Sequence, residues 1–358
     1  MLSARNVIVA LHEYHPPLGD RTGLRLDFNE NTVGASPRCL TRLRALTVED
    51  LARYPSREPI EREVASFLGL RPKEVLLTNG VDEGIRLLCE TYLEPGDETI
   101  IVAPTFAMYE ICALARGARV IAVPAGKGFA FPLEGILTAI GPRTRMIAIA
   151  NPNNPTGTTA TAEALLQIAN AAPEAALLLD EAYYEFFGET LMSAVPRVPN
   201  LFVARTFSKA YGLAGLRVGV LAGPETPMGY VRRACSPYNV NTVALAVLPT
   251  ALADTEYVDQ YVAEVRRGRE RLQKVLLERG IQYCPSRANF VLGDFGAVCK
   301  ELVRSMNRRG ILVRDRSSDP DCEGHVRITV GVEAHTDKLL AALRESLPEL
   351  KSAVEVVR

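Results

Sequence analysis

The chain has few of the residues that mark metalloproteins and disulfide-stabilised secreted proteins. Of its four histidines only His12 and His15 lie close together, and its seven scattered cysteines include no Cys-x-x-Cys pair. An odd, unpatterned set of cysteines is typical of reduced thiols in a cytoplasmic protein, and it favours neither a disulfide framework nor a zinc site. We therefore expect no metal ion in this protein.

Charge of one sign and long apolar runs are also lacking. The formal net charge is −1 and no basic block is present, so a nucleic-acid or anionic-membrane partner has no electrostatic basis. No apolar run reaches the ~18 residues that cross a bilayer. The N-terminus lacks the apolar core and cleavage pattern of a signal peptide. We expect a cytoplasmic protein with neither a nucleic-acid nor a membrane partner.

What the chain does contain is enough apolar sequence for a large core, with 47% hydrophobic residues in 358. Short, continuous apolar runs alternate with helical segments in the middle of the chain. Such runs are typical of strands buried on both faces, so the pattern predicts an α/β fold with a mostly parallel central sheet and helices on both faces. The predicted strands are Val75–Leu77, Thr99–Ala103, Met146–Ala150, Ala176–Asp180 and Leu201–Ala204, and the predicted helices are Gly84–Leu93, Met108–Ala115 and Ala162–Ala171.

The C-terminal part of the sequence has a different pattern. A long charged amphipathic helix is followed by three further strands with a helix among them, which predicts a smaller α+β domain. The helix is Tyr257–Arg279 and the strands are Asn289–Leu292, Ile311–Arg314 and Val326–Thr329. We expect an irregular N-terminal arm with part of the small domain over residues 1–45, a large domain over 46–250 and the small domain over 251–358.

Several polar motifs follow the predicted strands directly. Ligands of such sheets bind beyond the carboxyl ends of the strands, so these motifs are expected to face one crevice. They are Asn79-Gly80, Pro104-Thr105, Asn151–Gly157, Asp180 and Ser208-Lys209.

The run from Arg205 to Arg217, Arg-Thr-Phe-Ser-Lys-Ala-Tyr-Gly-Leu-Ala-Gly-Leu-Arg, is the most informative of these motifs. A lysine flanked by hydroxyls, glycines and an arginine suits an amine that forms a Schiff base with an aldehyde cofactor. Thr206, Ser208 and Arg217 would then hold the phosphate of that cofactor. The alternative is a strand followed by a solvated turn, with Lys209 an ordinary surface lysine.

The strand that ends at Leu77 runs through Asn79-Gly80 straight into a helix. Gly80 lets the backbone approach a ligand closely, and the free N–H groups of Val81 and Asp82 with the helix dipole suit a phosphate. The alternative is a glycine turn in which Asp82 caps the helix.

Two further motifs suit contacts to a cofactor ring. The two Asn-Pro pairs of Asn151–Gly157 predict a rigid loop, with a cis Asn154–Pro155 bond, that aims the Asn154 amide at a ligand; a structural turn is the alternative. Asp180 ends an apolar strand, where a carboxylate needs a cation such as a protonated pyridine nitrogen. Tyr183 could reach the phenolic oxygen of the same ring. Alternatively, Asp180 is a helix N-cap.

Arg327 lies within an otherwise apolar strand, Val326–Thr329, of the predicted second domain. A guanidinium that points from such a strand toward a cleft between domains suits a carboxylate or phosphate of a substrate. It could instead pair with Glu323 or Asp321.

Together these motifs resemble the fold-type I pyridoxal-phosphate aminotransferases, and within them the histidinol-phosphate aminotransferase branch. The resemblance extends from Leu26 to Gly331, and the Lys209 block together with the Asn-Pro-Thr-Gly loop is its most specific part. Its other marks are Leu26–Asn31, Arg53–Pro55, Gly80–Glu83, Pro104–Tyr109, Asp180–Tyr183, Pro237–Asn241, Ala288–Val291 and Arg327–Gly331.

The resemblance implies roles for particular residues. Lys209 would form the Schiff base and shuttle the proton, Asp180 would pair with the pyridinium, Asn154 and Tyr183 would bond the ring oxygen, and Tyr109 would stack on the ring. The remaining cofactor contacts fall on the phosphate: the Gly80, Val81 and Asp82 backbone, Thr206, Ser208, Arg217 and, from a partner subunit, Tyr54. A site completed by a neighbour implies a homodimer. On the substrate side the resemblance points to Tyr14, Asn31, Arg314, Arg327 and Tyr238.

The implied reaction is a ping-pong transamination between an amino donor and a 2-oxo acid, with histidinol phosphate and 2-oxoglutarate as the leading pair, in histidine biosynthesis. Glu13 and Thr32 replace frequent prolines of the family, in the arm that closes over the substrate. Arg314 could also be a surface ion pair with Asp315 or Asp319. An aromatic amino-acid aminotransferase, a threonine-phosphate decarboxylase-like lyase and a non-catalytic cofactor-binding module remain as alternatives.

Overall fold

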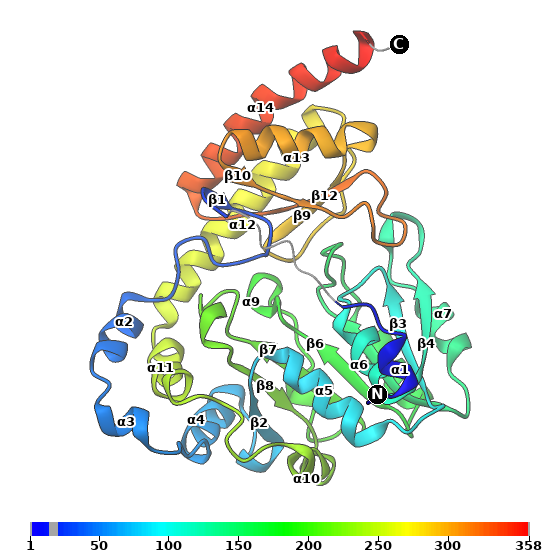
Figure 1. Cartoon of the computed structure of the whole chain (residues 1–358), viewed down its shortest axis with the longest axis vertical. Helices are drawn as coiled ribbons and strands as arrows, with labels where there is room; N and C mark the ends of the chain where they lie inside the picture. Colours follow the sequence, from blue (N-terminus) through cyan, green and yellow to red (C-terminus); the bar gives the residue numbers. More distant parts are fainter. Residues whose placement is uncertain (1, 14–20, 357–358) are drawn as a thin grey trace.

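The computed structural model of the chain describes residues 2–13 and 21–356, with side chains up to residue 347. Its largest element is a seven-stranded sheet with the strand order β2-β8-β7-β6-β5-β3-β4 (Figure 1). β8 is antiparallel to both of its neighbours and the other neighbouring strands pair in parallel, which confirms the predicted fold class. The strands are β2 (Val75–Thr78), β3 (Glu98–Ala103), β4 (Arg119–Pro124), β5 (Thr144–Ala150), β6 (Ala176–Asp180), β7 (Leu201–Thr206) and β8 (Gly219–Ala222).

Both faces of this sheet are covered, because successive side chains of a strand point to opposite faces. In β6, Ala176 and Leu178 belong to a buried cluster with α5, α6 and α10, whereas Leu177 and Leu179 belong to a second cluster with α7 and α8. The helices of the first face are α5 (Val81–Tyr92), α6 (Met108–Arg116) and α10 (Glu225–Ala234), and those of the second are α7 (Leu133–Ala139) and α8 (Ala162–Ala171).

A second body is built around two small sheets and is joined to the first by the long helix α12 (Figure 1). A third apolar cluster runs through this body and reaches β2 and β8 of the large sheet. The strands are β9 (Phe290–Asp294), β11 (Arg314–Asp315) and β12 (His325–Thr329) in one sheet, and β1 (Leu24–Arg25) and β10 (Ile311–Leu312) in the other. The helices are α12 (Thr255–Glu278), α13 (Cys299–Arg308) and α14 (Glu333–Val356). The domain bounds given above stay a prediction.

Two expectations are wrong in detail. The predicted strand Ile311–Arg314 is two short strands in different sheets, because β10 pairs with β1 from the N-terminal segment and β11 pairs with β12. Part of the N-terminal segment that the sequence describes as irregular is a helix, α2 (Pro37–Arg44), capped by the Ser36 hydroxyl, which accepts from the Arg38 N–H. The other helices of the first two hundred residues are α1 (Asn6–Val9), α3 (Val48–Ala52), α4 (Glu58–Leu68) and α9 (Tyr184–Phe187), and α11 (Thr242–Ala253) precedes α12.

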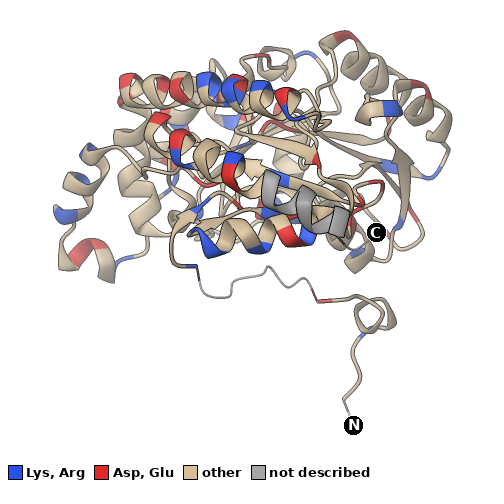
Figure 2. Cartoon of the chain, turned by 90° about the horizontal axis from the view of Figure 1, so that it is seen from above, with Lys and Arg blue, Asp and Glu red and all other residues tan. Residues whose placement is uncertain are grey.

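The surface carries charges of both signs, and the cysteines form no disulfide bonds. Lys and Arg are interspersed with Asp and Glu along the helices (Figure 2). All seven cysteines carry free thiols, and six of them are buried. Within residues 2–13 and 21–356, the helices are too short or too polar to span a membrane.

Candidate active site

The polar motifs that follow the strands meet at one edge of the large sheet. Since β2, β3, β5, β6 and β7 all run in the same direction, their carboxyl ends lie together. Hydrogen bonds link neighbouring motifs: the Asn151 N–H donates to the Asp180 carbonyl (2.8 Å) and the Thr105 hydroxyl donates to Asn153 Oδ1 (2.8 Å). The Asn154–Pro155 bond is cis, as predicted.

Asp180 lies at the centre of this edge and is 5% exposed. Its carboxylate accepts from the Tyr109 hydroxyl (2.6 Å) and from the Ala182 N–H (3.0 Å). Burial raises the pKa of Asp180 to about 6, and the two hydrogen bonds partly oppose this shift. A carboxylate that is desolvated in this way would be stabilised by a cationic partner.

Lys209 follows β7 in a turn that reaches from the large sheet toward the N-terminal segment. Its ammonium donates to the Phe28 carbonyl (3.0 Å). Burial, and next the charge of Arg327, lower the pKa of the Lys209 amine to about 8. About a tenth of the amine is then neutral at pH 7 and about half at pH 8, far more than for an ordinary lysine, and a neutral amine is what a nucleophile or base requires.

A cradle for an anion lies beside Lys209. Gly80, the N-cap of α5, has a φ of 76°, and a Cβ at this position would lie 2.6 Å from Nη2 of Arg217. Arg217 also pairs with the Asp82 carboxylate (3.0 Å), so the guanidinium lies over the start of the helix. The hydroxyls of Thr206 and Ser208 are buried at the end of β7, where Thr206 Oγ1 accepts from the Ser208 N–H (3.1 Å).

A second arginine enters the site from the other body. Arg327 of β12 is 4% exposed, and its guanidinium donates to Asn154 Oδ1 and to the Asp27 carbonyl (2.6 Å) rather than to Glu323 or Asp321. Its Nε is buried without a hydrogen-bond partner, and burial lowers the pKa of Arg327 to about 10. A buried guanidinium held by neutral oxygens, with its Nε–H unpartnered, is suited to an anionic ligand.

Tyr183 completes the group from the start of α9. It is 5% exposed, and its hydroxyl accepts from Asn29 Nδ2 (2.9 Å). Arg327 is a neighbour, and the charge of its guanidinium lowers the pKa of the Tyr183 phenol, although burial outweighs it and the net shift is upward. Arg327 thus contacts Asn154 and lies near Tyr183.

The other predicted substrate residues lie in different surroundings. Asn31 uses its side chain on the backbone: its amide donates to the Ala210 carbonyl (3.0 Å) and its oxygen accepts from Val33 and Gly34. Arg314 lies over the Phe28 ring, 5.6 Å from its centroid, and is in register with Arg327 in the sheet. Tyr14 lies outside the described residues.

Tyr54 and Tyr238 lie apart from the buried group, on the surface. Tyr54 is 81% exposed and Tyr238 is 53% exposed, and their rings stack at 4.4 Å. The two rings contact each other, but both tyrosines remain largely exposed to solvent in this chain.

Three neighbours of the site escape a sequence-based search. Asn29 has a φ of 56°, a conformation that asparagine tolerates better than most residues, and it holds both Tyr183 and the Thr329 hydroxyl. Glu181 and Arg205 form a buried ion pair (2.9 Å) on the residues next to Asp180 and Thr206. Asn29 could have been identified by its position in the Leu26–Asn31 motif. Glu181 and Arg205 could have been identified as charged residues within or next to apolar strands.

Similarity to known proteins identifies the family of this chain. The sequence profile of the aminotransferase class I and II family matches residues 21–344. The chain belongs to this family. Among its relatives, histidinol-phosphate aminotransferase 2 of Pseudomonas fluorescens is 38% identical over 90% of this chain and 89% of the relative. Histidinol-phosphate aminotransferase of a Geobacillus species is 36% identical over 91% and 90%.

The fold agrees with that of a solved structure. The histidinol-phosphate aminotransferase of Sinorhizobium meliloti, solved in complex with pyridoxal 5′-phosphate, superimposes with a TM-score of 0.88. It is 27% identical in sequence, and the match covers 96% of this chain and 97% of that one.

Proposed function

We propose that this aminotransferase uses pyridoxal 5′-phosphate to transfer the amino group of L-histidinol phosphate to 2-oxoglutarate in histidine biosynthesis. The observation that carries the proposal is that one edge of the sheet holds a half-buried Lys209 amine, a buried Asp180 carboxylate and an anion cradle. The names of the relatives supply the substrate.

The residues present fit that cofactor. The desolvated Asp180 carboxylate suits a pyridinium nitrogen, and Asn154 with Tyr183 suits the ring oxygen. The backbone N–H groups of Val81 and Asp82, with Thr206, Ser208 and Arg217, suit the phosphate, and the Gly80 N–H donates to the Thr78 carbonyl (2.9 Å). Tyr109, already bonded to Asp180, lies at the same place and would cover the ring.

The protein groups divide the chemistry among them. Pyridoxal phosphate, when bound, supplies an aldehyde for an amine and a ring that accepts the electrons of the substrate Cα. When the cofactor is bound, Lys209 would hold its aldehyde, and the amine of Lys209 in its free form would accept the proton from the Cα of the amino donor. Asp180 would keep the ring nitrogen protonated, and the anion cradle would hold the phosphate of the cofactor.

Arg327 and Arg314 are the proposed selectors of the substrate. Histidinol phosphate has no carboxylate, so Arg327 would bind its phosphate in one half reaction and a carboxylate of glutamate or 2-oxoglutarate in the other. Arg314, which lies in register with Arg327, adds a second positive charge to the same cleft. Tyr14, Asn31 and Tyr238 remain proposed substrate neighbours.

A spectral titration tests this function. The absorbance of the bound cofactor is followed while L-histidinol phosphate, and separately L-phenylalanine, is added to the purified protein. Bleaching at low histidinol phosphate, and only at far higher phenylalanine, supports the proposal. The reverse order identifies an aromatic aminotransferase, release of carbon dioxide from L-threonine phosphate identifies a lyase, and no response to any amino donor identifies a non-catalytic binding module.

The pKa of Lys209 predicts how the cofactor-free protein takes up pyridoxal phosphate. The neutral amine is the nucleophile, so the rate of covalent attachment should rise with pH and level off above about pH 8, where the amine is already neutral. An ordinary lysine would keep gaining rate to about pH 10. Stopped-flow absorbance over this pH range measures the midpoint, and a midpoint near 10 would contradict the burial argument.

A change at Arg327 should act on substrate binding. Arg327→Gln removes the charge and the free Nε donor, so the KM for both histidinol phosphate and 2-oxoglutarate should rise roughly 10- to 100-fold. Steady-state kinetics measures this, with the exposed Arg304→Gln of α13 as a control that should leave KM unchanged. An unchanged KM for Arg327→Gln would remove Arg327 from the substrate site.

We also propose a cytoplasmic homodimer in which Tyr54 reaches the cofactor phosphate of the partner subunit. The free thiols support the compartment, and the exposed Tyr54–Tyr238 stack supports a covering partner. Sedimentation should give the mass of two chains at the concentrations used for assay. A fully active monomer would contradict the role of Tyr54.

A further inference from the structure

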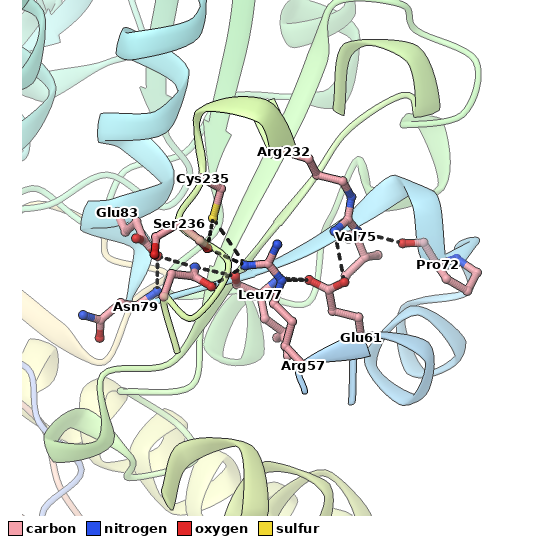
Figure 3. Close-up of polar contacts among 11 residues, drawn as sticks. Arg57, Glu61, Pro72, Val75, Leu77, Asn79, Glu83, Arg232, Cys235 and Ser236 are labelled. Atoms are coloured by element: carbon pink, nitrogen blue, oxygen red, sulfur yellow. Dashed lines mark hydrogen bonds and ion pairs between the residues drawn. The ribbon is translucent and has the colours of Figure 1, made fainter. Parts of the chain in front are cut away.

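The turn that begins α5 is held in place by a polar network that the catalytic residues do not share. Figure 3 shows this network, which joins α4, the start of α5 and the segment after α10. Its side chains come from Arg57, Glu61, Glu83, Arg232 and Asn239.

Glu83 is the contact between this network and the turn. Its Oε2 accepts from the Asn79 N–H (2.7 Å) and from Nδ2 of Asn239 (2.6 Å). Glu83 is the third residue of α5, and it reaches back past Gly80, an N-cap that has no side chain. Glu83 thus bonds the residue before the N-cap, and it fixes the backbone just before the N–H groups of Val81 and Asp82.

The orientation of the Asn239 amide follows from donor and acceptor rules. Its Oδ1 accepts from Arg57, and a guanidinium can only donate, so the NH₂ group must point the other way. The two N–H bonds then go to the Leu77 carbonyl (3.0 Å) and to Glu83. All the donors of this amide are used within the chain, so Asn239 acts through the turn and not on a ligand.

Arg57 is in turn anchored to a buried carboxylate. Its Nε pairs with Oε1 of Glu61 (3.2 Å), which is 3% exposed, and its Nη1 donates to the Ser236 carbonyl (3.0 Å). Glu61 also accepts from the Leu77 N–H (3.0 Å) and pairs with Arg232 (3.1 Å). The chain of hydrogen bonds therefore runs unbroken from a buried ion pair to the turn.

We propose that Asn239 and Glu83 are positioning residues that fix the Asn79–Asp82 turn for the phosphate of the cofactor. The inference rests on the proposed function, since it concerns the same phosphate. Backbone N–H groups bind an anion only when they point at it. A glycine N-cap such as Gly80 has no side chain that could hold the first turn of the helix, and its backbone is conformationally permissive. The hydrogen bonds of Glu83 to the Asn79 N–H and to Asn239 hold this turn in place of a capping side chain.

The test compares two aldehydes on the cofactor-free protein. Pyridoxal 5′-phosphate and pyridoxal share the ring and the aldehyde, so the dissociation constant of pyridoxal divided by that of pyridoxal 5′-phosphate isolates the contribution of the phosphate. Asn239→Ala and Glu83→Ala should each reduce this ratio about tenfold, the size expected for one hydrogen bond to a charged group. Glu83→Gln keeps an acceptor for both donors but loses the negative charge and the 3.5 Å contact to Arg86, so its ratio should stay closer to that of the parent than the ratio of Glu83→Ala.

Two further variants separate positioning from loss of folding. Asn200→Ala removes three hydrogen bonds of a buried asparagine at the other end of the sheet, and it should lower the melting temperature without changing the ratio. The double variant Glu83→Ala with Asn239→Ala should show little more loss than either single change, because both break the same contact.

The outcomes are distinct. A parent protein that does not prefer the phosphorylated aldehyde contradicts the proposed function itself. A parent that prefers it, with an unchanged ratio in both alanine variants, overturns the positioning role of Glu83 and Asn239. A ratio that falls equally in Asn200→Ala also overturns it, because the loss would then follow stability.

Discussion

Replacing Lys209 by alanine is expected to lower the rate of the half reaction with the amino donor by roughly 10³-fold or more. The change removes the amine that carries the aldehyde and the base that takes the proton from the substrate Cα. The base is effective because its pKa is about 8, so a large share is neutral at assay pH. Single-turnover absorbance with L-histidinol phosphate measures the loss.

Two further variants show whether the loss of rate comes from the missing amine or from the loss of a positive charge. Lys209→Arg keeps a positive charge near the Phe28 carbonyl but cannot give up its proton at pH 8, so it should be as slow as Lys209→Ala. Lys274→Ala, on the exposed side of α12, should keep the rate of the parent. A Lys209→Ala protein that retains a tenth of the parent rate would assign the proton transfer to another group.

The central sheet and the position of its site could be predicted from the sequence, because the relevant signals are local. Strands buried on both faces give continuous apolar runs, and β6 covers the predicted range Ala176–Asp180. A polar residue directly after such a run, like Asp180, must lie at the carboxyl edge. Parallel strands bring those edges together, so Asn154 and Lys209 were expected beside it.

The parts that could not be predicted depend on partners distant in sequence. The short strand β10 exists because β1 lies beside it, and no periodicity within residues 311–314 reveals this. The hydrogen bond between Arg327 and Asn154 likewise joins residues from two separate bodies. The network of Arg57 and Asn239 crosses between α4 and the segment after α10, and each residue alone resembles an ordinary surface polar group.

Exchange of Asp180 for asparagine should separate activity from stability. With a neutral amide, the ring nitrogen loses the carboxylate that keeps it protonated, so the rate of the half reaction should fall by roughly 10²- to 10³-fold. Tyr109 can still pair with the amide, because a phenol both donates and accepts. The absorbance assay used for Lys209 measures the rate.

The cofactor-free Asp180→Asn protein should at the same time be more stable than the parent at pH 8. Burial raises the pKa of Asp180 from 3.8 to about 6, so the folded state holds this proton more tightly than the unfolded state does. Its stabilising effect is complete below about pH 4 and is lost as the pH rises through 6. An asparagine avoids that loss, which corresponds to about 1–3 kcal/mol at pH 8. Thermal melts of both proteins should therefore differ at pH 8 and converge near pH 4, and a variant that is less stable at pH 8 would contradict the desolvation of Asp180.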